Sequence, residues 1–476
     1  MEMAWGYRHL GAAGLIVVLL SVWLYWKGNE LAEKPGMRWL GGRLRRLWPL
    51  PRAVPGKFTV MLAVFDNDPG GESRENIFSW LQKIDGVAVT RTARKIATGD
   101  AAAGHRLARR WLRRCGADVL IWGRILQDGG PKRAPDLFWT AASAVHYKPG
   151  GERYAVIAGD MRLPQMFWDD FLDVLRLHIA AQAAEVAARA GHYVAETLAP
   201  RIAQMRKLLN ASAPHARWTP AALAPMRWIF AGALLRYGAQ KGDAAALMEA
   251  ADAYRGVLTE WTRERTPLDW AMTQNNLGAA LSIVGERRGD NEALENAVVA
   301  YRAALTERTR ERTPLDWAKA QNNLGRVLYA LGLRRGDEAL LTEAAAACRE
   351  ALTEFTRERT PLGWAKAQND LGRVLRALGL WRDDDALLKK SVAACRAALT
   401  EWTRERTPLD WAKAQNDLGA VLCALGAWAG DRALLTEAAA AYENALDAFR
   451  AAAAHFYVKM VEDNLQRVRQ LLERTK

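Results

Sequence analysis

Hydrophobic positions near the N-terminus form one long run. Residues 10–26 read LGAAGLIVVLLSVWLYW and carry no charge, which is the short end of the length that a transmembrane helix needs. The run ends in Trp23, Tyr25 and Trp26, as expected of an aromatic belt at a membrane interface. A cleaved signal peptide is the alternative, but the KGNELAEK that follows offers no small-residue cleavage site. The pattern predicts a membrane anchor.

Shorter apolar segments predict a small α/β domain over residues 57–160. We expect strands at 57–66, 87–92, 117–126, 137–145 and 153–157, and helices at 73–84 and 100–115. Strands that alternate with helices favour parallel pairing. The loop NDPGGES, at 67–73, precedes a helix, where phosphate can bind. It matches neither glycine-rich phosphate-binding motif, so we interpret it as a structural turn. Residues 165–221 are expected to connect this domain to the next through helices broken at Pro200 and a proline-rich loop.

The second half of the chain repeats itself. The pattern PLDWAxxQNxLG recurs with tryptophans at 270, 317, 364 and 411, which are 47 residues apart. Tyr254, Tyr301, Cys348, Cys395 and Tyr442 keep the same spacing and add an earlier, divergent copy. A fixed period of this length predicts a stacked solenoid. We expect five units over 222–449, followed by a capping helix at 452–476.

Local signals predict that each unit is a helical hairpin. The threonine before each PLDW or PLGW sequence can cap a helix whose first residue is proline. Four glycines are expected to end the first helices as C′ residues, and four aspartates to cap the second helices; these are Gly285, Gly332, Gly379 and Gly426, then Asp290, Asp337, Asp384 and Asp431. The second helix is expected to continue through TRERT. We expect the repeated tryptophans to lie in the core, with Cys348 and Cys395 packing in place of the tyrosine.

Two stretches resemble known families. Leu277, Gly278 and Leu281, followed by Ala297, Tyr301, Ala304 and Leu305, match the pattern of the tetratricopeptide repeat, and the long unit resembles the repeats of kinesin light chain. The run GADVLIWGRI, after a strand ending in VFDND, resembles the small α/β domain of TolB-like and CsgG/FlgO-like bacterial proteins. That resemblance implies a binding or assembly module. The predicted fold is therefore mostly α, with an N-terminal transmembrane helix, a small α/β domain and a C-terminal α-solenoid of helical-hairpin repeats.

The resemblance to tetratricopeptide repeats implies that the first helices line a concave groove. By position, the polar residues of that groove are Lys319, Lys366 and Lys413, then Asn275, Asn322, Asn369 and Asn416, then Arg326 and Arg373. These positions lie three and four residues apart, so they share one helical face. Asparagines can hold a peptide backbone, and the cations can bind carboxylates. The prediction is an acidic or extended peptide of a protein partner. The alternative is that these side chains bond between adjacent repeats and face solvent.

Charge changes the picture mainly beside the anchor. The chain carries 67 Lys and Arg against 53 Asp and Glu, a net charge of +14, and residues 27–57 contribute eight positive and two negative charges. The positive-inside rule then places the N-terminus outside and the bulk in the cytoplasm, as a single-pass protein of a bacterial inner membrane. Residues 1–56 are expected to hold the anchor and a basic segment that contacts anionic lipid through Arg38, Trp39, Arg43, Arg45, Arg46 and Trp48. A topogenic flank without lipid specificity is the alternative.

No pattern of catalytic chemistry emerges. The seven histidines are scattered, and no metal-binding or nucleophile motif accompanies them, so we expect no enzyme activity, metal or cofactor. Nucleic-acid binding has only the overall charge in its favour, and we do not expect it. The sequence predicts a membrane-anchored scaffold that recruits a protein. The alternative is a sensor whose α/β domain binds a small ligand.

Overall fold

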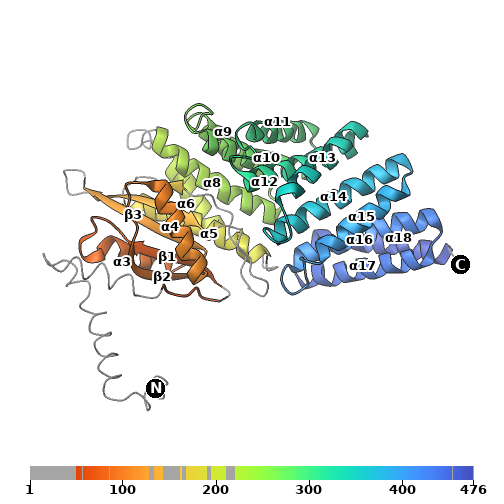
Figure 1. Cartoon of the computed structure of the whole chain (residues 1–476), viewed down its shortest axis with the longest axis horizontal. Helices are drawn as coiled ribbons and strands as arrows, with labels where there is room; N and C mark the ends of the chain where they lie inside the picture. The colour runs from red at the N-terminus through yellow and green to blue at the C-terminus, as the bar shows by residue number, and fades with distance from the viewer. Residues whose placement is uncertain are drawn as a thin grey trace, which may run out of the picture.

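The computed structural model describes residues 50–55, 57–84, 86–127, 133–142, 161–162, 168–189, 195–210, 220–452 and 454–474. A sheet domain lies at one end of an elongated molecule, and the helical array extends from it to the C-terminus (Figure 1). The predicted anchor at 10–26 and the predicted lipid contacts from Arg38 to Trp48 lie outside the described residues. Among the described helices, none combines the length and the apolar character that crossing a bilayer requires.

The sheet has five strands in the described part of the chain, in the order β2-β1-β3-β4-β5. They are β1 (Phe58–Val64), β2 (Val87–Lys95), β3 (Val119–Gln127), β4 (Arg133–Ala141) and β5 (Met161–Arg162). β1 pairs in parallel with β2 and with β3, as the sequence predicts. The prediction of parallel pairing is wrong for β3 with β4 and for β4 with β5, which are antiparallel. The connection from Gln127 to Arg133 is too short for the crossover that parallel strands need. The strand expected at 153–157 lies outside the described residues.

Helices cover both faces of the sheet. α4 (Ala101–Cys115) packs Trp111 and Leu112 against Met61, Leu120 and Trp122 on one face. α3 (Glu72–Leu81) and α5 (Trp168–Arg189) cover the opposite face, which presents other side chains of the same strands. Successive residues of a strand point to opposite faces, so the continuous apolar strands supply a core on each side.

The loop before α3 is a structural turn. The carboxylate of Asp68 accepts hydrogen bonds from the backbone N–H groups of Ser73, at 2.9 Å, and Arg74, at 3.0 Å. These N–H groups at the start of α3 are the ones that a phosphate would use. A negative side chain therefore already occupies the position at which a nucleotide phosphate would bind.

Helices α5 and α6 (Ala199–Asn210), with the short helix η2 (Ala195–Thr197) between them, join the sheet to the array. The predicted break at Pro200 is confirmed, because α5 ends at Arg189 and a new helix, α6, begins at Ala199 with Pro200 as its second residue. In the first turn of a helix the missing N–H of proline costs nothing. The ring centre of His178, on α5, lies 4.4 Å from that of Trp139 on β4 and 6.3 Å from that of Trp228 on α8 (Pro220–Lys241). These rings connect the sheet domain to the first repeat.

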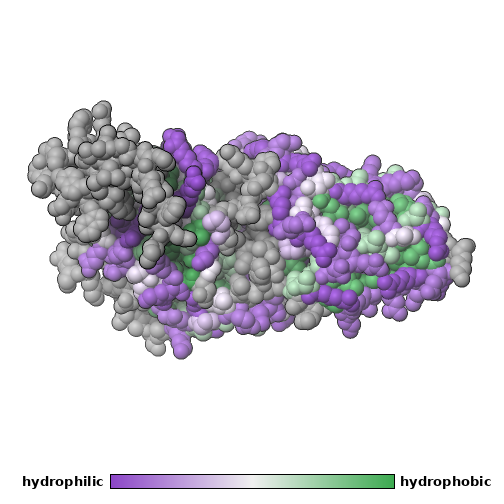
Figure 2. Space-filling model, turned by 90° about the horizontal axis from the view of Figure 1, so that it is seen from below, coloured by the Kyte–Doolittle hydropathy of each residue, from purple (hydrophilic) through white to green (hydrophobic). Residues whose placement is uncertain are grey.

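Each of the five predicted units is a helical hairpin, as expected. The pairs are α8 (Pro220–Lys241) with α9 (Ala244–Leu258), α10 (Pro267–Arg288) with α11 (Asn291–Glu307), α12 (Pro314–Arg335) with α13 (Glu338–Glu354), α14 (Pro361–Arg382) with α15 (Asp385–Leu399), and α16 (Pro408–Ala429) with α17 (Arg432–Ala451). α18 (His455–Arg474) packs on α17 at the end of the stack (Figure 1). Seen from below, the C-terminal end of the array shows hydrophobic residues bordered by hydrophilic ones (Figure 2).

The glycines expected to end the first helices have a different role. The first helices continue past Gly285 and its equivalents by one turn and end before a residue in the left-handed conformation, such as Gly289 or Asp383. A Cβ atom at Gly285 would lie 2.6 Å from Cγ of Leu294, on the second helix. The prediction of a C′ glycine at these positions is therefore wrong, because the glycine permits the two helices of a hairpin to approach closely.

The predicted caps are confirmed for the second helices only. The side chains of Asp290, Asp337, Asp384 and Asp431 accept hydrogen bonds from backbone N–H groups in the first turn. The threonines before the first helices make no capping hydrogen bond with their side chains, although proline does occupy the first helical position after each of them.

The TRERT segments are turns, so the prediction that they prolong the second helices is wrong. α11 ends at Glu307, before the TRERT sequence at 309–313, and α13 ends at Glu354, before the TRERT sequence at 356–360. The four repeated tryptophans, Trp270, Trp317, Trp364 and Trp411, are half-buried and not in the core. Cys348 and Cys395 are buried beneath Gly325 and Gly372, which confirms their packing role.

Candidate functional site

The polar residues predicted for the groove come from the first helices α10, α12, α14 and α16. The three lysines lie at equivalent positions early in α12, α14 and α16. Lys366 is exposed, whereas Lys319 and Lys413 are half-buried. The Lys413 ammonium lies 3.4 Å from the Asp410 carboxylate and 5.9 Å from the ring centre of Tyr457, on α18. This row places one lysine in each of the last three units, whereas Met272 occupies the equivalent position of α10.

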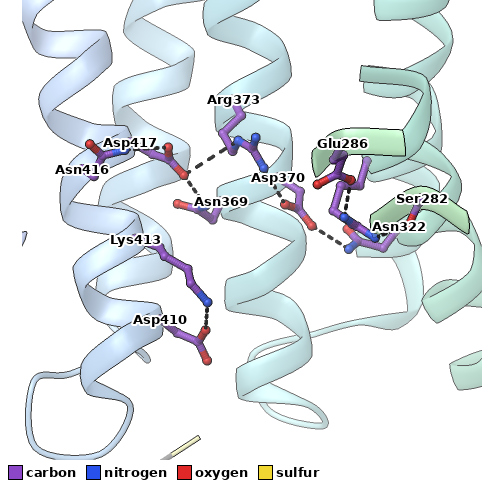
Figure 3. Close-up of polar contacts among 11 residues, drawn as sticks. Ser282, Glu286, Asn322, Asn369, Asp370, Arg373, Asp410, Lys413, Asn416 and Asp417 are labelled. Carbon is purple, nitrogen blue, oxygen red and sulfur yellow. Dashed lines mark hydrogen bonds and ion pairs between the residues drawn. The ribbon is translucent and has the colours of Figure 1, made fainter. Parts of the chain in front are cut away.

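The asparagines do not face an open groove. Asn275 and Asn322 are 2% exposed and Asn369 is 5% exposed. Asn322 and Asn369 each donate from Nδ2 to an aspartate of the next first helix, Asp370 and Asp417, at 2.8 Å (Figure 3). Inter-repeat bonding, the alternative left open by the sequence, therefore describes the contacts of these side chains.

These contacts form a polar ladder with a regular step. An asparagine in one first helix bonds a residue 48 positions later, one more than the repeat length; the rungs are Asn275 with Asn323, Asn322 with Asp370, Asn369 with Asp417, and Asn416 with Asn464. The last rung reaches α18. This helix therefore takes the place of a first helix in a sixth, incomplete unit.

The two arginines of the predicted site also bond between units. Arg326 donates to the hydroxyl of Ser282 at 2.9 Å and pairs with Glu286, both on α10. Arg373 lies 3.9 Å from Asp370 and from Asp417, with its guanidinium 4.8 Å from the ring centre of Tyr329. Glu286 raises the pKa of Arg326 above its ordinary value.

Carboxylates of the array therefore balance much of the charge on this face. A carboxylate ligand that reached Arg326 or Arg373 would have to compete with Glu286, Asp370 or Asp417. Lys319, Lys366 and Lys413 are not rungs of the ladder, and Lys413 pairs with Asp410.

The TRERT segments carry a second ladder, which the sequence reading missed. Arg263, Arg310 and Arg357 each donate from Nε to a glutamate one unit later, at 2.7, 2.7 and 2.6 Å. The same guanidinium groups lie 5.9, 5.9 and 5.8 Å from the ring centres of Trp270, Trp317 and Trp364. Because arginine, tryptophan and glutamate all recur at the repeat spacing, the period itself was the signal that could have revealed this ladder.

The described residues hold no group of three or more His, Cys, Asp or Glu side chains placed to bind a metal ion. In the sheet domain, His105 Nδ1 lies 2.7 Å from the hydroxyl of Thr140, which also accepts from the indole of Trp122 at 2.8 Å. Burial, with a smaller contribution from Arg109, lowers the pKa of His105 to about 4. These partners hold His105 against the sheet as a packed residue.

Comparison with known proteins agrees with the geometry of the array. The model of the tetratricopeptide repeat matches residues 317–354, 364–399 and 411–451, which are three successive hairpin units without the turns between them. Residues 317–451 are tetratricopeptide repeats. The hairpins α8–α9 and α10–α11 extend the same stack toward the sheet domain. Tetratricopeptide repeats are typically non-enzymatic and mediate protein–protein interaction.

One solved structure provides a weaker comparison. It is described as a circular tandem repeat protein with novel repeat topology and enhanced subunit contact surfaces, and it is 17% identical over 64% of this chain and 85% of that chain, with a TM-score of 0.25. This likeness carries no argument about the arrangement of the units. No curated protein matches the chain.

Proposed function

We propose that this protein is a membrane-anchored adaptor that recruits a protein partner through its tetratricopeptide repeats. The observation that carries the proposal is the lysine row Lys319, Lys366 and Lys413, one cation in each of the last three units, at equivalent positions of their first helices. An acidic or extended peptide that lies along these helices would meet a positive charge at each of the three units. Lysine binds carboxylates as a compact, mobile point charge, so it suits a ligand whose register is not fixed.

The test compares two variants of equal net charge. The groove variant replaces Lys319, Lys366 and Lys413 with alanine. The control variant replaces Lys389, Lys390 and Lys459, which are exposed on α15 and α18. Both are immobilised as full-length protein and used to capture proteins from membrane extracts. We expect the groove variant alone to lose the captured protein. Identical capture by both variants and the wild type would exclude this surface as the binding site.

The anchor is proposed from the apolar run at 10–26 and the basic residues after it. Single-pass insertion in a bacterial inner membrane, with the N-terminus outside, would leave the sheet domain and the repeats in the cytoplasm. A reporter fused after Lys476 tests this orientation. A reporter active only in the cytoplasm is expected, and one active in the periplasm would reverse the topology.

A further inference from the structure

The outer face of α4 is a row of arginines. Four of them are exposed, Arg106, Arg110, Arg113 and Arg114, and Arg109 is half-buried between them and the sheet. These positions recur at intervals of three and four, so they share one side of the helix. No aspartate or glutamate lies between Ala101 and Cys115. Burial lowers the pKa of Arg109, and the neighbouring charge of Arg113 lowers it further. Arg106 lies 4.0 Å from the carboxylate of Asp100, the N-cap of α4, and α4 itself holds no carboxylate to balance the five arginines.

This row lies on the side of the sheet opposite to the array. α4 covers the face formed by Met61, Leu120 and Trp122. α5, which contacts α8 of the first repeat, lies on the other face. A flat anionic surface could therefore approach the arginines from one side while the repeats extend from the other.

The first described residues of the chain lie beside these arginines. Leu50 and Ala53 pack against the apolar cluster beneath α4, and the Ala53 N–H donates to the carbonyl of Cys115, the last residue of α4, at 2.9 Å. Arg113 and Arg114 precede Cys115 directly. The 24 residues from Trp26 to Leu50 can extend over at most ~80 Å, so α4 is within reach of the bilayer that would hold residues 10–26.

We propose that the arginine row of α4 docks on the anionic lipid headgroups of the membrane in which the chain is anchored. This inference rests on the proposed anchor. Arginine forms paired, charge-assisted hydrogen bonds with phosphate groups, and each basic residue near an anionic membrane surface strengthens association roughly fivefold. A single-stranded nucleic acid also presents phosphates, but the one tryptophan of α4, Trp111, is buried against the sheet and offers no surface on which bases could stack. A duplex, which is bound through its phosphates, is one of the outcomes of the test below.

The experiment places a reporter on the arginine face of the full-length protein. Ala102 is exposed one turn before Arg106, so an Ala102→Cys substitution, made together with Cys423→Ala, attaches a fluorophore there; the other cysteines are buried. The protein is reconstituted into vesicles of phosphatidylcholine, with or without phosphatidylglycerol. Quenching by acrylamide, which is uncharged and so is not itself repelled by anionic lipid, then measures the ratio of docked to undocked α4.

We expect the fluorophore to be protected in vesicles that contain phosphatidylglycerol and accessible in neutral vesicles. Protection should fall as salt is added, because the screening length shrinks to about 3 Å at 1 M. Replacing Arg110 and Arg114 with glutamine should lower the docked ratio roughly 25-fold, at about fivefold for each arginine. The matched control, Arg288→Gln with Arg349→Gln, removes the same charge from the array and should leave protection unchanged.

The possible outcomes distinguish a failure of α4 docking from a failure of the proposed membrane anchor. Equal quenching in both kinds of vesicle, with the protein retained in both after an alkaline wash, would overturn the docking of α4 and leave the anchor standing. Loss of the protein from neutral vesicles, with salt-sensitive and arginine-dependent binding to anionic ones, would overturn the anchor and support the docking. Binding to neither kind would overturn both. Protection by a DNA duplex without lipid, lost in the Arg110 and Arg114 variant, would assign the row to nucleic acid.

Discussion

Single residues decide how closely the helices of the array approach. A Cβ atom at Gly285 would lie 2.6 Å from Leu294 Cγ and 2.9 Å from the backbone oxygen of Asp290, and the backbone cannot move away as a side chain can. Gly285→Ala should therefore destabilise the protein by about 1–3 kcal/mol, as overpacking does. Urea unfolding of the full-length protein measures the change.

Gly256 provides the control for that substitution. It lies in α9, where an added Cβ would meet nothing closer than Arg227 at 3.8 Å. Gly256→Ala should stabilise the protein by roughly 0.5–1 kcal/mol, since alanine loses less conformational entropy in a helix. Equal effects of the two substitutions would mean that Gly285 is not a close-approach residue.

Arg308 occupies a position that is aromatic in neighbouring units. It is 6% exposed, with Asp316 3.9 Å away, and its Nη1 has no hydrogen-bond partner among the described residues. Trp261, Phe355 and Trp402 take the same place at intervals of 47. Replacing a weakly paired buried charge with a fitting apolar side chain is neutral or stabilising by about 1–4 kcal/mol. Arg308→Trp should therefore raise the urea midpoint, and the reverse change, Phe355→Arg, should lower it. A destabilised Arg308→Trp would show that the guanidinium has a structural partner.

At the scale of elements, the repeat period predicted the hairpins but not the turns between them. Proline as the first residue of each first helix and aspartate before each second helix are local signals, and both are confirmed as helix starts. The role of TRERT depends on contacts 44 residues away, such as Arg310 with Glu354, which no local propensity encodes. The sequence offered bonding of the asparagines between repeats only as the alternative to a peptide groove, because the step of 48 residues crosses the boundary between units. The sequence pattern places Asn322 and Lys319 on one helical face. In the structure Asn322 is buried against α14, whereas Lys319 is half-buried, and the pattern could not predict this difference.

The arginine–glutamate pairs of the TRERT segments predict how the stability of the protein changes in acid. Hydrogen bonds from Arg310, and to a smaller extent from Arg359, lower the pKa of Glu354. A carboxylate whose pKa is depressed in the folded state stabilises it above the ordinary pKa and loses that contribution as the pH falls through the depressed value. Glu354→Gln should therefore lower the urea midpoint at pH 7, and its difference from the wild type should vanish in acid. Glu358→Gln, at an exposed position in the same turn, should show no difference at either pH. If the urea midpoint of Glu354→Gln stays below that of the wild type in acid, the stability does not come from the ionised Glu354 carboxylate.

At the scale of the whole molecule, one aromatic junction joins the sheet domain to the repeats. His178 is 2% exposed between Trp139 and Trp228. The ring nitrogens His178 Nε2, Trp139 Nε1 and Trp228 Nε1 are buried without a hydrogen-bond partner among the described residues. The sequence indicated two domains with a linker, but it could not reveal this contact, because each ring reads as an ordinary core residue of its own element. A neutral imidazole at this place lets the two parts share one core.

That junction predicts a dependence on mild acid. Burial, and then the charge of Arg236, lower the pKa of His178 from 6.5 to about 3. Between these values the unfolded chain binds a proton that the folded protein does not, so stability should fall by about 1.4 kcal/mol for each pH unit below 6.5. Urea unfolding between pH 7 and pH 5 measures how the free energy of unfolding changes with pH. The variant His178→Phe keeps an aromatic ring against Trp139 and should lose the part of this pH dependence that His178 contributes. The pKa of His105 is also lowered, to about 4, so this residue too makes stability fall in acid. A His105→Phe variant separates the two contributions. If His178→Phe keeps the slope of the wild type, the imidazole is not held neutral at the junction, and the sheet domain and the array do not share a core through it.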